Sequence, residues 1–371
     1  MLVRTHVHTY GVSIFRGIKM TKRSRKQNKF RQQRPIPWRN LLITFIIFVA
    51  LSAAAWFVRN RSENADEAVD PIQAPVLAVT PAPASQYRGA SYCQARPAFI
   101  SDFELTGQPI IGTSLRGFTG FTVAEQMATG EIGRIIQHPT WTEAGNLGAY
   151  TRDGDGNIYT APVPFSSVEL NDPEMQTLLY IIPSVDGIMR PFSEVPAEQA
   201  PTEQNCFGVM GLFFDCDTKS LYAASIAGST AQDEVGCIAR IDIENGEVVD
   251  RLKGVDALGV GVHNGVNGKR LYFGLARNSA VASIALDEEG NFAGEPRQEF
   301  FLAGLPGGGN DKAQRITFTQ DGQMIVKGTE FDYTLRASSD SERTLYFFSY
   351  LPAEDAWELT NVDRTDAPII Q

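Results

Sequence analysis

The sequence predicts an all-β protein: a β-propeller of about five to six four-stranded blades, preceded by a single transmembrane helix. Three observations lead to this prediction. A strand–turn–strand pattern recurs in the second part of the chain, glycine (33) and proline (20) are plentiful while long helical patterns are absent, and one uncharged apolar run lies near the N-terminus. Stacked β-sandwiches are the main alternative for the β-rich part.

Each repeat unit has two halves. The first half is a small apolar strand, a turn rich in Asp, Asn and Gly, and a strand with an aromatic residue, and it occurs at 147–162, 211–225, 260–275 and 316–328. The second half is an alternating strand and an acidic turn, and it occurs at 178–187, 238–246, 281–290 and 345–355. Residues 97–146 leave room for a fifth unit. These units fall within the roughly 4–8 blades that propellers have.

The apolar run Leu41–Val58 contains eighteen residues without a charge. As a helix it spans about 27 Å, close to the ~30 Å of a bilayer core. Residues 1–40 carry eleven Lys or Arg and no acid, so the positive-inside rule predicts a cytoplasmic N-terminus. We therefore predict a signal anchor in the cell membrane, with the propeller in the periplasm or at the cell surface. A signal peptide cleaved at Ala53–Ala55 and a start at Met20 are open alternatives.

The chain thus divides into four predicted regions: a basic cytoplasmic tail (1–40), a transmembrane anchor (41–58), an acidic Pro/Ala-rich stalk (59–90) and an extracytoplasmic propeller (91–371). The stalk has four prolines and too few apolar residues to form a core. Subtracting the eleven basic residues of the tail from 33 leaves 22 against 43 acids, a net charge of −21 for residues 41–371. Such a surface argues against nucleic acid as a partner.

All four cysteines follow the apolar run: Cys93, Cys206, Cys216 and Cys237. Export predicts disulfides, and four cysteines allow three pairings. The short separation of Cys206 and Cys216 suits a bridge that closes one loop, while four free thiols are the alternative. A zinc site is disfavoured because the chain has no C-x-x-C pair.

The text GNLGAYTRDGDGNIYTAP (145–162) resembles a blade of the NHL-repeat and regucalcin/gluconolactonase-like propellers, at the superfamily level. In the gluconolactonase-like proteins, Asn and carboxylate side chains on loops that lead into the innermost strands hold calcium, which polarises a lactone. The corresponding candidates in this chain are Asn146, Asn205, Asp256, Asn310, Asp311 and Arg315. The resemblance implies Asn146, Asp256 and Asp311 as the metal ligands. The glutamate that opens the family's first inner strand has no counterpart, and Glu104 is the nearest carboxylate.

Other catalytic patterns are missing from the sequence. There is no G-x-S-x-G elbow, and the glycine-rich text at 305–312 lacks the phosphate-loop pattern, so we interpret it as an inter-blade loop. The DGDGN text (153–157) lacks the glutamate of a calcium loop and predicts a hairpin turn. His138 and His263 are both interpreted as loop or turn residues.

The leading hypothesis is therefore a non-enzymatic, membrane-anchored module that binds a protein partner or a small ligand, as an accessory subunit of a membrane assembly. The alternative is a calcium-dependent lactonase, so the sequence leaves open whether the chain is an enzyme. A quinoprotein-like dehydrogenase is a third class, and the chain lacks its tryptophan-docking repeats.

Overall fold

The computed structural model describes residues 87–113, 115, 117–164, 173–201, 205–307, 309–333 and 343–365, all within one compact unit, Val79–Gln371. The predicted tail, the predicted anchor and the stalk up to residue 86 lie outside the described residues. Within the part of the chain that is described, no helix has the length and apolar character needed to cross a membrane. The anchor therefore stays a prediction from the sequence.

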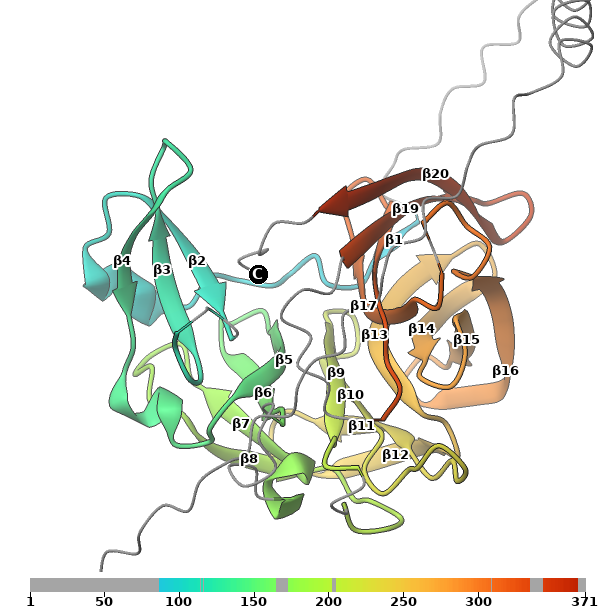
Figure 1. Ribbon diagram of the computed structural model, residues 1–371, viewed down its shortest axis with the longest axis horizontal. Helices are drawn as coiled ribbons and strands as arrows, with labels where there is room; N and C mark the ends of the chain where they lie inside the picture. The colour runs from blue at the N-terminus through green and yellow to red at the C-terminus, as the bar shows by residue number, and fades with distance from the viewer. Residues whose placement is uncertain are drawn as a thin grey trace, which may run out of the picture. The chain divides into compact units, whose positions relative to one another are not determined.

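The described residues form five antiparallel sheets, the blades of an all-β propeller (Figure 1). Blade 1 is β2 (Gln108–Gly112), β3 (Thr122–Gln126) and β4 (Ile132–Ile136). Blade 2 is β5 (Leu147–Arg152), β6 (Ile158–Pro162), β7 (Leu178–Ile182) and β8 (Arg190–Glu194). Blade 3 is β9 (Val209–Asp215), β10 (Ser220–Ser225), β11 (Cys237–Asp242) and β12 (Val248–Lys253).

Blade 4 is β13 (Ala257–Gly265), β14 (Gly268–Leu275), β15 (Ala280–Leu286) and β16 (Phe292–Phe301), with β1 (Arg88–Gly89) added beside β13. Blade 5 is β17 (Lys312–Phe318), β18 (Met324–Thr329), β19 (Arg343–Leu351) and β20 (Ala356–Thr365). The short 3-10 helices are η1 (Ala98–Phe103), η2 (Pro139–Thr142) and η4 (Pro173–Thr177). The predicted propeller is confirmed with five blades, although blade 1 has three strands and blade 4 has five.

The hairpin turn predicted at 153–157 is confirmed by its hydrogen bonds. The Asp153 carboxylate accepts the backbone N–H groups of Asp155 (3.0 Å) and Asn157 (2.9 Å), and Gly156 has a φ of 82°. An Asx turn of this kind fixes the backbone before the next strand begins. The aspartate and glycine of the text therefore determine where β5 ends and β6 starts.

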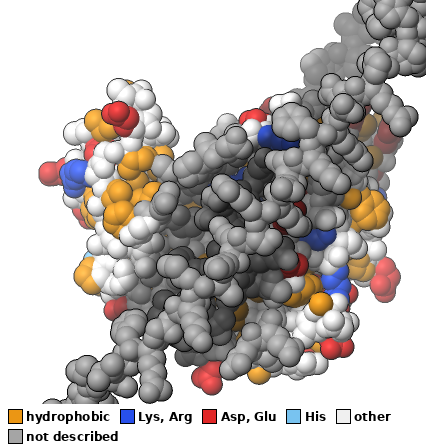
Figure 2. All heavy atoms as spheres, in the orientation of Figure 1, with side chains coloured by type: hydrophobic (Ala, Val, Ile, Leu, Met, Phe, Trp, Pro, Cys, Tyr) orange, Lys and Arg blue, Asp and Glu red, His pale blue; other side chains and the backbone are white. Residues whose placement is uncertain are grey.

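Four hydrophobic cores join neighbouring blades in series. Blades 1 and 2 share a core around Trp141 and Ile158, and blades 2 and 3 share one around Tyr159 and Leu221. The fully buried rings of the cores between blades 3 and 4 and between blades 4 and 5 include Tyr222, Phe273, Tyr272, Tyr346 and Phe348. In the described residues no such core joins blade 5 to blade 1. Figure 2 shows hydrophobic side chains at the surface over β2 and β3.

Glycine allows the innermost strands to approach closely. A Cβ atom on Gly211 of β9 would lie 2.4 Å from the Leu258 carbonyl oxygen of β13, and one on Gly259 of β13 would lie 2.8 Å from the Arg315 Cα of β17. Both separations are shorter than any van der Waals contact, so neither position accepts a side chain without moving a backbone. The glycines therefore set the spacing of β9, β13 and β17.

Residues 87–99, here called the strap, cross the end of the propeller at which the innermost strands finish. The strap contacts blades 5, 4, 3 and 2 in chain order. The Tyr87 ring lies 5.7 Å from that of Tyr350, β1 pairs with β13, and the Ala95 and Ala98 N–H groups donate to Asp153 and Ser184 of blade 2 (3.0 and 2.8 Å). Residues 88–90 were expected in the stalk, but this strand pairing and the burial of Ala90 make them part of the propeller.

The strap is attached to blade 3 by a disulfide between Cys93 and Cys216, whose Cα atoms lie 5.7 Å apart. Cys206 and Cys237 are buried free thiols, and burial raises the pKa of each. The suggested bridge between Cys206 and Cys216 is wrong. The whole of β9 separates them, and seven extended residues span about 23 Å, because a strand rises about 3.3 Å per residue.

Candidate functional site

The candidate site lies where the loops lead into the innermost strands, and Asp256 is its central group. Asp256 immediately precedes β13 and is 0% exposed. One carboxylate oxygen accepts the Ser229 hydroxyl and the Gly236 N–H (3.0 Å), and the other accepts the Tyr333 hydroxyl (2.5 Å) and lies 3.2 Å from Arg277 Nε. A buried carboxylate with this many donors is held in one orientation.

Arg277 extends this network to the loop after β10. Its two terminal nitrogens donate to the carbonyl oxygens of Ala231 (3.1 Å) and Thr230 (2.8 Å), and Glu234 lies 3.4 Å from its Nε. Glu234 in turn accepts the Asp256 N–H at 3.0 Å. The arginine therefore neutralises the buried carboxylate and closes the loop over it.

Asn205 has a structural role of the same kind. Its amide nitrogen donates to the carbonyl oxygens of Ile226 (2.9 Å) and Ser229 (2.6 Å), and its side-chain oxygen accepts the Phe207 N–H (3.0 Å). The predicted site residues Asn205 and Asp256 thus meet at Ser229. The structure brings these two together as a framework for the surrounding loops.

The remaining predicted site residues lie apart from this network. Asp311 accepts the Tyr346 hydroxyl at 2.8 Å, and burial raises the pKa of its carboxyl group. Arg315 lies over the Tyr150 ring, 5.2 Å from its centroid. Asn310 is exposed, and Asn146 is half-buried, with its carbonyl oxygen accepting the Val163 N–H.

No group of three or more His, Cys, Asp or Glu side chains arranged to hold a metal occurs in the described part of the chain. Both oxygens of Asp256 already accept protein donors. A calcium ion bound by Asn146, Asp256 and Asp311 therefore stays a prediction from the family resemblance.

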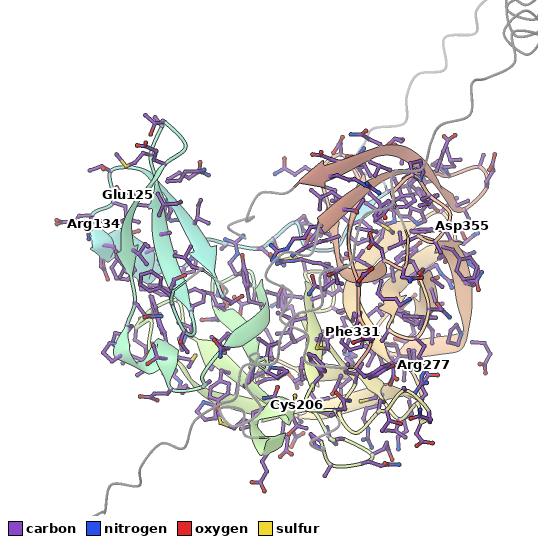
Figure 3. All side chains as sticks on the ribbon, viewed as in Figure 1. Glu125, Arg134, Cys206, Arg277, Phe331 and Asp355 are labelled. Atoms are coloured by element: carbon purple, nitrogen blue, oxygen red, sulfur yellow. A yellow bond between two sulfur atoms is a disulfide. The ribbon has the colours of Figure 1, made fainter. Side chains whose placement is uncertain are left out.

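An aromatic cluster beside Asp256 was missed by the sequence reasoning. This mouth cluster consists of the buried Tyr333, Ile226, Leu258 and Ala276 and the half-buried Phe207, Met210 and Phe331. The rings of Phe207 and Phe331 lie 5.2 Å apart, those of Phe331 and Tyr333 lie 5.0 Å apart, and Arg277 lies 5.6 Å from the Tyr333 centroid. Figure 3 labels Phe331 and Arg277. The sequence does contain a signal for this cluster. Phe207, Phe331 and Tyr333 lie in loops, where an aromatic side chain is not needed for packing within a blade.

His263 lies near the opposite end of β13, and its interpretation as a turn residue is wrong. The turn of its hairpin is only Val266–Asn267, so His263 belongs to the strand and is 0% exposed. Aromatic rings surround it, with Trp357 at 4.9 Å, Tyr350 at 5.0 Å and Phe318 at 5.2 Å between centroids. Neither ring nitrogen has a hydrogen-bond partner, and burial lowers the pKa of His263 to about 4.

No protein-family model and no curated protein matches this chain. The solved structures that resemble it include a protein from Lactobacillus plantarum (12% identity, 69% of this chain and 68% of that one, TM-score 0.41), a candidate 6-phosphogluconolactonase from Bacteroides uniformis (13%, 70% and 72%, 0.38) and a protein from Desulfotomaculum acetoxidans (12%, 69% and 80%, 0.39). At these values the likeness carries no conclusion about activity. The propeller rests on the strand pairing of the chain itself.

Proposed function

We propose that this chain is a membrane-anchored, extracytoplasmic binding module, and that its propeller binds a protein partner through the mouth cluster as an accessory subunit of a membrane assembly. The observation that carries the proposal is the pair of half-buried phenylalanines, Phe207 and Phe331, beside Arg277. Phenylalanine, the other aromatic residues, methionine and arginine are enriched in protein–protein interfaces. Loops held by a rigid scaffold are the usual location of such residues.

The polar groups beside this cluster support binding in preference to catalysis. Asp256 accepts hydrogen bonds from Ser229, Gly236 and Tyr333 and forms an ion pair with Arg277, so both of its carboxylate oxygens already have protein partners. Its partners hold the loops that carry Phe207 and Tyr333. A rigid framework of this kind reduces the conformational entropy that the loops lose on binding.

Photo-crosslinking in the native membrane tests the binding surface. A benzophenone amino acid replaces Phe207 or Phe331 in the full chain, and Val249, which is 47% exposed on the outermost strand β12, is the control position. We expect a discrete protein adduct from positions 207 and 331 and none from 249. The adduct from position 207 should fall several-fold when Phe331→Ala is added. Equal adducts from all three positions, or none, would contradict the proposal.

The anchor is tested separately by alkaline extraction of membranes that contain the full chain. Because residues 41–58 form an uncharged run of helical spanning length, we expect the full chain to stay in the membrane pellet and a chain lacking 41–58 to be released. Release of the full chain would overturn the anchoring, and would leave the binding surface to be decided by the crosslinking.

A further inference from the structure

His263 of β13 is a buried imidazole without a polar partner. It is 0% exposed, and in the described part of the chain neither of its ring nitrogens has a hydrogen-bond partner. The rings of Phe318, Tyr350 and Trp357 surround it, with centroids 4.9–5.2 Å away. A neutral imidazole can occupy such an apolar site at some cost, whereas a protonated imidazole requires water or a counter-charge. The site therefore favours the neutral form.

The strap forms the outer wall of this site. The Tyr87 ring lies 5.7 Å from that of Tyr350, and Gly89 pairs with His263 itself in the β1–β13 ladder. A Cβ atom on Gly89 would overlap the Phe318 side chain, so glycine allows the strap to approach this closely. The first three strap residues thus contact two of the three rings around the imidazole, and lifting them would give water a route to it.

The strap is held by few contacts at this end and covalently beyond it. β1 has only two residues, and Ala90 adds two backbone hydrogen bonds, to Val262 and Cys216, both of 2.8 Å. Three residues further along, Cys93 is fixed to Cys216 by the disulfide. A segment with so few contacts opens at a lower free energy than the blades do. Residues 87–90 can therefore leave β13 while the rest of the domain stays folded.

Asp355 is the carboxylate that acts on His263, and it already has partners of its own. It accepts hydrogen bonds from Arg297 (2.9 Å), the Tyr350 hydroxyl (2.6 Å) and Asn267 (3.1 Å). Burial lowers the pKa of His263 to about 4 and outweighs the charge of Asp355, which acts in the opposite direction. The carboxylate therefore does not keep a proton on the buried imidazole at neutral pH.

Strand β14 brings a cation and a neutral hydroxyl to the same site. Arg270 lies directly opposite His263 in the strand register, where its guanidinium donates to Ser283 (2.7 Å) and lies 3.9 Å from Glu299. Burial raises the pKa of Tyr272, so its hydroxyl stays neutral. Neither group compensates a charge on His263.

The other elements around the imidazole add no negative charge. β1 contributes Arg88, whose guanidinium lies over the Tyr92 ring, 3.7 Å from its centroid. β17 and β20 contribute uncharged rings. In the sequence, the eight residues before the strap, 79–86, carry no charge. Among the described residues, Asp355 is thus the anion that faces His263.

We propose that His263 is an acid-operated release for the strap: when its imidazole takes up a proton, residues 87–90 separate from β13, while the disulfide keeps the strap attached to the domain. The closed strap excludes the water that a protonated imidazole needs. Opening admits water, so proton uptake favours the open form. The inference is independent of the mouth cluster and its partner.

The open form becomes more favourable as the pH falls. The pKa of His263 is about 4 behind the closed strap, against 6.5 for a solvated imidazole. Between these values the open form binds a proton that the closed form does not. From pH 7 to pH 5 the equilibrium constant for opening should therefore rise by up to about 20-fold.

Hydrogen exchange of the backbone amides tests the release in the purified full chain. The rates are measured by mass spectrometry at pH 7 and pH 5 and corrected for the intrinsic pH dependence of exchange. We expect the opening constant of the amides at 88–90 to rise by about 10- to 20-fold at pH 5. Because a local opening exposes little surface, a low concentration of urea should leave this constant unchanged. A constant that is equal at both pH values, or that rises with urea in step with the slowest amides of the domain, would overturn the proposal.

His263→Phe tests whether the imidazole is the group that takes up the proton. The variant removes the titrating group and keeps an aromatic ring, so its strap amides should open to the same extent at pH 7 and pH 5. A rise that persists in this variant contradicts the role of His263.

Gly89→Ala gives a second readout, which decides if His263→Phe does not fold. Its Cβ overlaps Phe318 and holds the strap away, so by reciprocity the pKa of His263 should rise toward 6.5. Hydrogen exchange at the imidazole C2 position measures this pKa. Gly154→Ala is the matched control, because its Cβ would lie 3.5 Å from Cys93 Sγ, an ordinary contact with the strap, and it should leave the pKa unchanged. Equal His263 pKa values in Gly89→Ala and the unaltered chain would overturn the coupling between the strap and the imidazole.

Discussion

Strand β13 has a fully buried titratable group at each end, and the two are stabilised in opposite ways. Asp256, just before the strand, has a partner for each carboxylate oxygen, including Arg277. His263, near its far end, lies among aromatic rings with both nitrogens unpartnered. Protein donors and a guanidinium compensate the first group, whereas the second lies in an apolar environment that disfavours its charged form. The second makes the folded state sensitive to mild acid.

The largest expected effect comes from removing the compensated charge. Asp256→Ala leaves Arg277 without its buried counter-charge and the Tyr333 hydroxyl without its acceptor. We expect a loss of about 3–5 kcal/mol in the free energy of unfolding, measured by denaturant titration. Ser229→Ala, which removes one hydrogen bond to the same carboxylate, is the milder comparison at about 1 kcal/mol. Equal losses from the two variants would contradict the central role of the Asp256–Arg277 pair.

The second effect concerns the strap, which covers the His263 end. Replacing Cys93 and Cys216 by serine removes a cross-link across 123 residues. We expect a loss of about 2–4 kcal/mol in the free energy of unfolding, again by denaturant titration. Cys237→Ser is the control, because it changes a cysteine that forms no disulfide. In this variant a reducing agent should shift the unfolding midpoint by the same amount as in the unaltered chain. If the unfolding midpoint is unaltered after loss of the disulfide, the prediction that the disulfide stabilises the folded domain is wrong.

The third effect is acid sensitivity at His263. The pKa is about 4 in the folded chain against 6.5 as the reference, so between these values the unfolded chain binds a proton that the folded chain does not. Stability therefore falls as the pH falls from about 6.5 to about 4, by roughly 3 kcal/mol in total, since each pKa unit corresponds to about 1.4 kcal/mol. His263→Phe should flatten this part of the pH profile, because the substitution removes the titrating group and keeps an aromatic ring in its place. A profile that is unchanged in His263→Phe would refute the assignment.

The repeated strands could be predicted from sequence because their signals are local. Aromatic and β-branched residues alternate in each blade, and the Asp and Gly of 153–157 determine a turn within five residues. The strap, the disulfide and His263 could not be predicted in this way. β1 is only Arg88–Gly89, too short for any periodicity, and its partner β13 lies more than 170 residues later. His263 was assigned to a turn because its text is turn-like, whereas its strand continues through Gly265.

For the predicted site residues, too, local features could be predicted and contacts between distant segments could not. Loop positions could be predicted from the repeat, and Asn205 and Asp256 do meet at Ser229. Which of them are free to bind a ligand depends on donors from distant segments, such as Tyr333 and Arg277, which the repeat does not align. The burial of Lys327, which is 9% exposed, could not be predicted either, because an alternating strand normally exposes its polar residues.

The disulfide of the strap also determines how the domain would bear tension. A pull on the chain from its N-terminal side acts first on the two-residue pairing of β1 with β13, which can be peeled away one hydrogen bond at a time. The peeling stops at Cys93, where a covalent bond passes the load to Cys216 in the turn after β9. Because the disulfide connects Cys93 directly to Cys216, the chain between these two cysteines, including residues 94–99 and blade 2, bears no load. The strap therefore lets the domain extend by a few residues under load and stops the extension at a covalent bond, before the blades unfold.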